Sequence, residues 1–123
     1  MNVAVVGASD KPSRYSFQAI QALLDAGHRV FPVHPKIKKI LDLPVYSDMS
    51  TISESLHTIT LYVNQERSTA MMGAILALHP ARLIFNPGAE NQVLYEKAQT
   101  QGIHVLNACT LVMLSTHQFE SAK

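Results

Sequence analysis

Five short apolar runs are spaced along the chain, and a polar, glycine-containing or proline-containing turn follows each of them. The runs are residues 3–6, 29–33, 58–63, 82–85 and 103–106. Continuous apolar segments of this length are typical of strands that a parallel sheet buries on both faces. We therefore predict five strands. Pro32 weakens the prediction for the second, because proline has no N–H to donate to a sheet ladder.

Between these runs the apolar residues recur at helical spacing. Phe17, Ile20 and Leu23 fall on one face of a helix that begins near Ser16, and Gly27 is a typical C-terminal cap. Asn64 is predicted to cap a second helix, which ends at Pro80. Residues 90–101 form a third helical pattern. A short helix is expected over residues 50–56 and an irregular connection over residues 43–50.

Strands that alternate with helices predict right-handed crossovers and a parallel sheet. The expected fold class is therefore α/β, a Rossmann-like three-layer fold with a five-stranded parallel sheet and helices on both faces. A chain of 123 residues with 47% hydrophobic residues suits one domain, residues 1–123. The apolar segment 109–114 is expected to form a last buried strand or helix, or a subunit interface. The polar tail, residues 115–123, is expected to fray.

Charge and cysteine content narrow the class of protein. The net charge of +1 gives no general attraction to nucleic acid or to an anionic membrane. The single cysteine, Cys109, excludes an internal disulfide and fits a reducing compartment. No basic segment followed by an apolar run opens the chain, and no apolar stretch reaches the roughly 20 residues that span a bilayer. We expect a cytoplasmic protein.

In open α/β sheets, ligands bind beyond the carboxyl ends of the strands, which makes the strand-end turns the candidate site. The first turn is the most informative, because a lone glycine is followed by small and cationic residues before a helix begins. Its candidate phosphate-binding residues are Gly7, Ala8, Ser9, Lys11, Arg14 and Ser16. The alternative interpretation is a tight turn in which serines merely cap the helix. Tyr15 could stack on an adenine or line the path of a ligand.

The turn after the second strand indicates which phosphate compound binds. An NAD-binding fold usually has an acidic residue there, whereas this chain has His34, Pro35 and Lys36, and no carboxylate until Asp42. A lysine attracts a phosphorylated ribose, which predicts NADP or coenzyme A (CoA). The other strand ends add five candidate contacts: Val63, Asn64, Asn86, Pro87 and Gly88.

Taken together, these motifs resemble the small CoA-binding-domain family, which is similar to the CoA-binding part of the succinyl-CoA synthetase α subunit. "VVGASDKPSRYS" matches the family's opening strand and turn, and "FPVHP" matches its "P-V-N-P"-like motif with His34 in place of Asn. "ILDLPVYSDM" has Asp42 where glycine is common, and "NPGAEN" resembles a "Q-P-G-A" turn. Asn107-Ala108-Cys109 stands where the family often has Asp-Arg-Cys.

The resemblance covers roughly residues 2–110 and implies CoA or acyl-CoA as the ligand. It implies a pyrophosphate site near Gly7 to Ser9 and an adenosine site near His34 to Lys36. No nucleophile, acid–base pair or metal-ligand spacing is evident, so we expect a binding module without a catalytic constellation of its own. Two alternatives stay open, an NADP-dependent oxidoreductase-like protein and an oligomeric interaction protein with a relic nucleotide cleft. A separate catalytic partner and a homo-oligomer are both compatible with the sequence.

Overall fold

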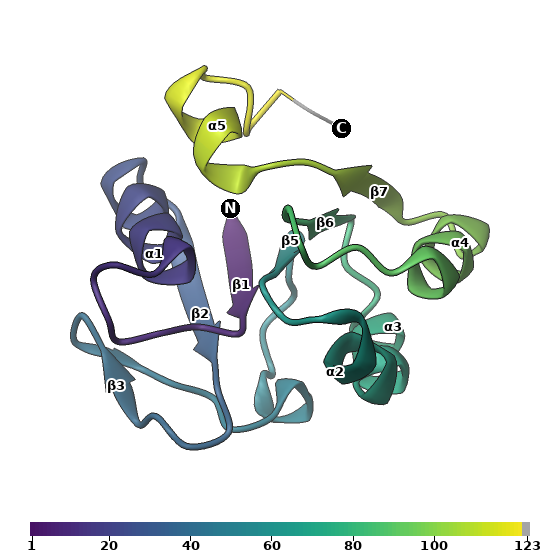
Figure 1. Cartoon of the computed structure of the whole chain (residues 1–123), viewed down its shortest axis with the longest axis horizontal. Coiled ribbons are helices and arrows are strands. Elements are labelled where there is room, and N and C mark those ends of the chain that lie inside the picture. The colour runs from purple at the N-terminus through teal and green to yellow at the C-terminus, as the bar shows by residue number, and fades with distance from the viewer. Residues whose placement is uncertain (122–123) are drawn as a thin grey trace.

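The computed structural model describes residues 1–121, which build a central five-stranded sheet with all strands parallel (Figure 1). Its strands lie in the order β2-β1-β5-β6-β7. Their bounds are Asn2–Val6 (β1), Arg29–Val33 (β2), Thr58–Leu61 (β5), Arg82–Phe85 (β6) and His104–Asn107 (β7). The Rossmann-like α/β fold class and the five parallel strands are thus confirmed. The strand order reverses between β1 and β5, which makes the carboxyl ends of these two strands the switch point of the sheet.

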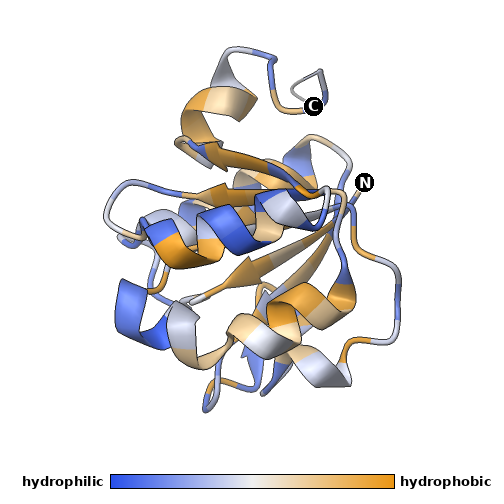
Figure 2. Ribbon diagram, turned by 90° about the vertical axis from the view of Figure 1, so that its right-hand side faces the viewer, coloured by the Kyte–Doolittle hydropathy of each residue, from blue (hydrophilic) through white to orange (hydrophobic). Residues whose placement is uncertain are grey.

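Helices cover both faces of the sheet. Ile20 and Leu23 of α1 (Tyr15–Asp25) share a core with Met113 of α5 (Thr110–Ser115). On the other face, Ile75 of α3 (Met72–Leu78) shares a core with Leu94 of α4 (Gln92–Thr100). In Figure 1 the sheet lies between α1 on one side and α2 (Gln65–Ala70), α3 and α4 on the other, and Figure 2 shows that its strands are largely apolar. Every helix within residues 1–121 is too short or too polar to span a bilayer.

The alternation of side chains along β1 explains why the run is apolar throughout. Val3 and Val5 pack into the core beneath α1, whereas Ala4 and Val6 pack into the core on the opposite face. Because successive side chains of a strand point to opposite faces, a strand with a helix layer on each side has no face left for polar residues.

Pro32 is accommodated because β2 is an edge strand. The Pro32 carbonyl accepts a hydrogen bond of 2.9 Å from the amide of Tyr46, a residue outside the five-stranded sheet. Within a strand, the N and O of one residue point to the same side. The missing N–H of Pro32 therefore faces away from β1 and removes no bond from the ladder.

The connection after β2 differs from the expectation. It contains a two-stranded antiparallel hairpin of β3 (Lys39–Ile40) and β4 (Leu43–Pro44), where we expected only irregular chain. Its turn residues Leu41 and Asp42 both have positive φ, +48° and +64°, as a two-residue hairpin turn of the I′ type requires.

The short helix expected over residues 50–56 is reduced to one 3-10 turn, η1 (Met49–Thr51). Asp48 binds the Ser50 amide at 2.8 Å, and the Thr51 hydroxyl donates to the Asp48 carbonyl. Such local bonds from Ser, Thr and Asp compete with continued helix. The helix after Asn64 is also interrupted: α2 (Gln65–Ala70) ends at Met71, from which α3 begins.

The tail after α5 is anchored, contrary to the expected fraying, although residues 122–123 lie outside the described part. Phe119 is 2% exposed. The Arg82 guanidinium lies 4.3 Å from the centre of its ring and donates through Nη1 to the Phe119 carbonyl at 2.6 Å. Arg82 Nε donates to Thr58 Oγ1 at 3.0 Å, so the tail is fastened to two strands of the sheet.

At the switch point, β1 and β5 approach each other so closely that no side chain fits at Gly7. A Cβ on Gly7 would lie 2.9 Å from Val63 Cγ1 and 3.0 Å from the Tyr62 carbonyl. The φ of Gly7 is +85°, which L-residues rarely adopt. The residue is therefore required on both steric and conformational grounds.

His28 lies beneath the tail, and its side chain is 2% exposed. Its Nδ1 accepts from the Met1 amino group at 3.1 Å, its Nε2 lies 3.4 Å from a carboxylate oxygen of Glu120, and its ring meets Phe119 edge-on. Burial lowers the pKa of His28. The positive charges of the N-terminus and Arg82 lower it further, while Glu120 opposes them.

Replacing Gly7 by alanine is expected to destabilise the fold by about 2–4 kcal/mol, from the left-handed φ and the clash with Val63. Gly73→Ala is the matched control, because a Cβ at Gly73 meets nothing within 4 Å and the residue lies in α3. That substitution should be neutral or stabilising. Denaturant unfolding of both variants measures the difference, and equal stabilities would contradict the close approach at Gly7.

We expect the free energy of unfolding to fall as the pH drops from about 7 to 5. The unfolded chain protonates His28 near its ordinary pKa of about 6.5, whereas the folded chain resists protonation until lower pH, so acid favours unfolding. The pKa of His57 is also lowered, mainly by burial, so His57 likewise reduces the free energy of unfolding as the pH falls. His28→Gln should flatten this pH dependence in denaturant titrations at pH 5–7, and an unchanged slope would contradict the assignment.

Candidate functional site

The amides of the first turn divide into two groups. Those of Gly7 and Ala8 both donate to the Val33 carbonyl, at 3.2 and 3.1 Å. The turn thereby joins the ends of β1 and β2, and these two amides are not available to a phosphate. The amides of Ser9 and Asp10, which come next, have no acceptor within residues 1–121.

The N-terminus of α1 points to the same place and lacks a side-chain cap. Its N-cap residue is Arg14, and none of the predicted serines fills the role. Ser9 Oγ accepts from the Lys11 amide at 3.1 Å instead, and Ser16 is buried. The first amides of this 11-residue helix therefore keep their donor capacity and the positive end of the helix dipole. The alternative in which the serines cap the helix is wrong.

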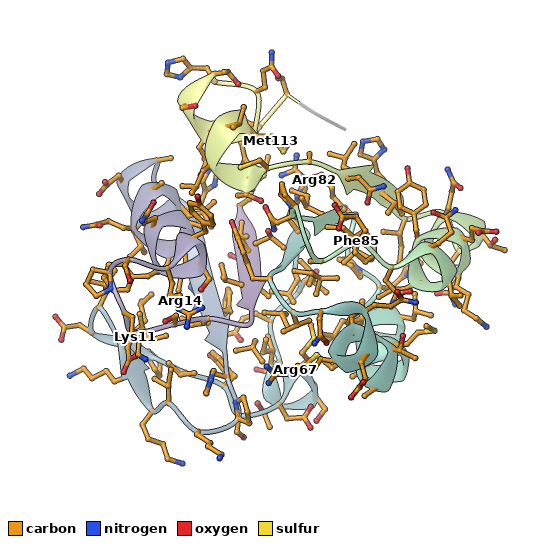
Figure 3. The ribbon with its side chains drawn as sticks, viewed as in Figure 1. Lys11, Arg14, Arg67, Arg82, Phe85 and Met113 are labelled. Atoms are coloured by element: carbon orange, nitrogen blue, oxygen red, sulfur yellow. The ribbon has the colours of Figure 1, made fainter. Side chains whose placement is uncertain are left out.

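A cleft of about 600 Å³ lies over the switch point and gathers most of the predicted site residues. Three cationic side chains line it: Lys11 and Arg14 from the β1–α1 loop and Arg67 from α2 (Figure 3). The predicted residues that line it are Gly7, Ala8, Ser9, Lys11, Arg14, Tyr15, Ser16, His34, Val63, Asn64, Pro87 and Gly88. Segments distant in sequence thus meet in one cationic cleft.

A smaller pocket of about 180 Å³ adjoins the cleft. It lies between the end of β2, the segment around Asp48, and α2 and α3. Met49, Met71 and Ala74 give it an apolar wall. Pro35 lines this pocket and not the larger cleft. Asp48 accepts hydrogen bonds from Ser50, and the bond from the Ser50 backbone N–H is the main reason that the pKa of Asp48 is lowered. The side chain at the pocket is therefore a carboxylate.

His34 shapes the turn that separates β2 from the hairpin. Its Nδ1 accepts from the backbone amides of Lys36 at 3.0 Å and Ile37 at 3.1 Å. The Nδ1 of His34 thus acts as a hydrogen-bond acceptor for two amides of the turn. An asparagine side-chain oxygen bonds the same amides in an Asx-turn.

Two predicted residues, Lys36 and Asn86, line neither the cleft nor the smaller pocket. Lys36 is exposed and lines neither cavity. Asn86 is buried and serves the fold: its Nδ2 donates to Thr60 Oγ1 at 2.6 Å and to the Leu61 carbonyl at 2.9 Å, and its Oδ1 accepts from the Thr110 amide. Asn86 thereby fixes the turn after β6 to β5 and to the start of α5.

Five residues that line the cleft were not predicted from the sequence: Asp10, Ile37, Tyr62, Arg67 and Ala89. Arg67 is in the first turn of α2, only three residues after the Asn64 cap. A cationic residue so close to the end of a strand could have been predicted to line the site. Tyr62 has a buried hydroxyl near Thr60 and Thr110, and burial raises the pKa of this hydroxyl to about 12. The phenol therefore stays protonated at neutral pH.

Outside this region, an open groove of about 850 Å³ runs between α1 and α5 and contains none of the predicted site residues. No group of three or more histidine, cysteine or acidic residues within 1–121 is arranged to hold a metal ion.

Comparison with known proteins shows the same fold in other chains. A crystal structure of an uncharacterized protein is 36% identical, with a TM-score of 0.91 over 96% of this chain and 97% of that one. The uncharacterized protein YneT of Bacillus subtilis (strain 168) is 26% identical over 85% of this chain and 77% of its own length. A dinucleotide-forming acetyl-coenzyme A synthetase of Ca. Korarchaeum cryptofilum shares the fold at 22% identity and a TM-score of 0.74, over 87% of this chain and 25% of that one.

The family comparison extends over nearly all of the elements described above. The model of the CoA binding domain matches residues 1–115, from the first residue to the end of α5. That range includes the uncapped start of α1, the His34 turn and both cavities. The chain belongs to the CoA binding domain family.

Proposed function

We propose that this protein binds CoA or an acyl-CoA in the cleft above the switch point and holds it without transforming it. The observation that carries the proposal is the set of free donors at one place. The amides of Ser9 and Asp10 and the uncapped start of α1 lie beside Lys11 and Arg14. Helix N-termini with free N–H groups and nearby cations are anion sites, and a pyrophosphate satisfies them.

The two cavities suit the two ends of a nucleotide. A cavity of about 150 Å³ holds one benzene ring, so the smaller pocket, with its apolar wall, suits a flat base held on one side. Its position after β2 agrees with an adenosine near His34 and Pro35. Pro87 and Gly88, at the far side of the cleft, are then left for the pantetheine arm. Tyr15, which is 72% exposed at the cleft, could stack on part of the ligand.

Thermal unfolding with CoA, NADP or NAD added separately tests the proposal. CoA at one hundred times its Kd should add about 2.7 kcal/mol, a shift of several degrees for a domain of this size. Arg14→Gln should reduce the shift. Lys97→Gln, an exposed change on α4 outside both cavities, should not.

Either of two other results would contradict the proposal. A shift with NADP alone would favour the oxidoreductase alternative. The absence of any shift at millimolar ligand would leave a relic cleft, and solution mass would then test the oligomeric alternative.

The turn at His34 generates a second test. His34→Asn should keep the stability within about 0.5 kcal/mol and preserve CoA binding, because an amide oxygen can accept from Lys36 and Ile37. His34→Ala leaves both amides without the acceptor and should cost about 1 kcal/mol, with weaker CoA binding. Denaturant unfolding and calorimetric titration measure the two effects. Equal behaviour of the Asn and Ala variants would contradict the role of Nδ1.

A further inference from the structure

Arg67 occupies the junction between the two cavities. Four residues line both the cleft and the smaller pocket: Gly7, His34, Val63 and Arg67. Of these, Arg67 alone carries a permanent positive charge. The Arg67 amide donates to Asn64 Oδ1 at 2.9 Å, which fixes its backbone in the first turn of α2.

The guanidinium of Arg67 forms no bond that stabilises the fold of residues 1–121. It makes no hydrogen bond or ion pair with any residue in the range 1–121, and the side chain is exposed. A guanidinium presents five donors in a planar fork that matches the oxygens of a phosphate. Its surroundings therefore leave it free to bind an anion at the junction.

Each cavity also has an acidic residue in its lining, Asp10 in the larger cleft and Asp48 in the smaller pocket. Asp48 lines that pocket beside Ser47 and Met49, but it does not line the larger cleft. Its carboxylate repels a phosphate group and can accept from an exocyclic amine. The charges favour the base at the Asp48 side and phosphate at the Arg67 side.

We propose that Arg67, and not Lys36, binds the phosphate on the ribose of CoA and so distinguishes CoA from its dephosphorylated form. This inference rests on the proposed function. When the base fills the smaller pocket and the pyrophosphate lies at the start of α1, the ribose between them must lie at the junction. A phosphate on that ribose then lies where Arg67 lines both cavities, whereas Lys36 lines neither.

The test is the ratio of the Kd values for dephospho-CoA and CoA, measured by calorimetric titration for each variant. A charge-assisted pair of this kind gives a preference of at least about tenfold for CoA in the natural protein. Arg67→Gln should bring the ratio close to one by weakening CoA alone. Arg67→Lys should restore part of it. Lys36→Gln is the matched control and should keep the full ratio.

Each other outcome overturns the assignment in a recognisable way. If Lys36→Gln removed the preference for CoA over dephospho-CoA and Arg67→Gln kept it, Lys36 would be the residue that binds the ribose phosphate. Equal weakening of both ligands by Arg67→Gln would place Arg67 at the pyrophosphate. A natural protein that binds both ligands equally would refute the phosphate contact and leave CoA binding intact, whereas one that binds neither would refute the proposed function as well. Thermal unfolding without ligand checks that each variant is folded.

Discussion

The close approach of β1 to β5 at Gly7 is the constraint on which the candidate site depends. Gly7 has no Cβ that would clash with Val63. The chain can therefore turn immediately after β1 and pass over the end of β5. The same turn brings the Gly7 and Ala8 amides to the Val33 carbonyl. The ends of three neighbouring strands, β2, β1 and β5, are thereby fixed relative to one another. The cleft forms above them.

This constraint decides which donors face a ligand. The two amides nearest the glycine are used to join strands, so anion binding moves to Ser9, Asp10 and the start of α1. A helix start that no side chain caps costs stability, since capping typically contributes about 1 kcal/mol. The other long helix, α4, has its cap in Asn91, whose Oδ1 accepts from the Leu94 amide. The start of α1, which lies at the cleft, therefore keeps N–H groups that no capping side chain uses.

Buried asparagines hold the remaining turns in place. Asn91 Nδ2 donates to Ser68 Oγ at 2.8 Å and to Thr69 Oγ1 at 3.0 Å, which ties the start of α4 to α2. Asn86 joins three segments in the same manner. Buried amides are costly unless all their partners are present, so these bonds specify one arrangement of the turns. Arg67 on α2 is held relative to the cleft by this framework.

The sequence predicted the features that repeat along the chain and missed those that depend on single contacts. The five strands follow from the hydrophobic pattern, because burial on two faces leaves a clear signature. The anchoring of Phe119 could not be inferred, since it requires knowing that Arg82 lies beneath the tail. A polar residue such as Asn86 at the end of a strand can either contact a ligand or hold the turn in place. The sequence does not distinguish these roles, whereas the structure shows the side chain bonded to Thr60 and Leu61.

The departures from the family pattern show what those motifs require physically. His34 stands where asparagine is expected, yet its Nδ1 accepts the two amides that an asparagine oxygen would bond. Asp42 stands where glycine is common, and it adopts the positive φ for which glycine is favoured. Both positions keep a backbone geometry with a different side chain. A motif of this kind is best compared by the conformation and hydrogen bonds it produces, and by that measure the His34 turn and the hairpin remain intact.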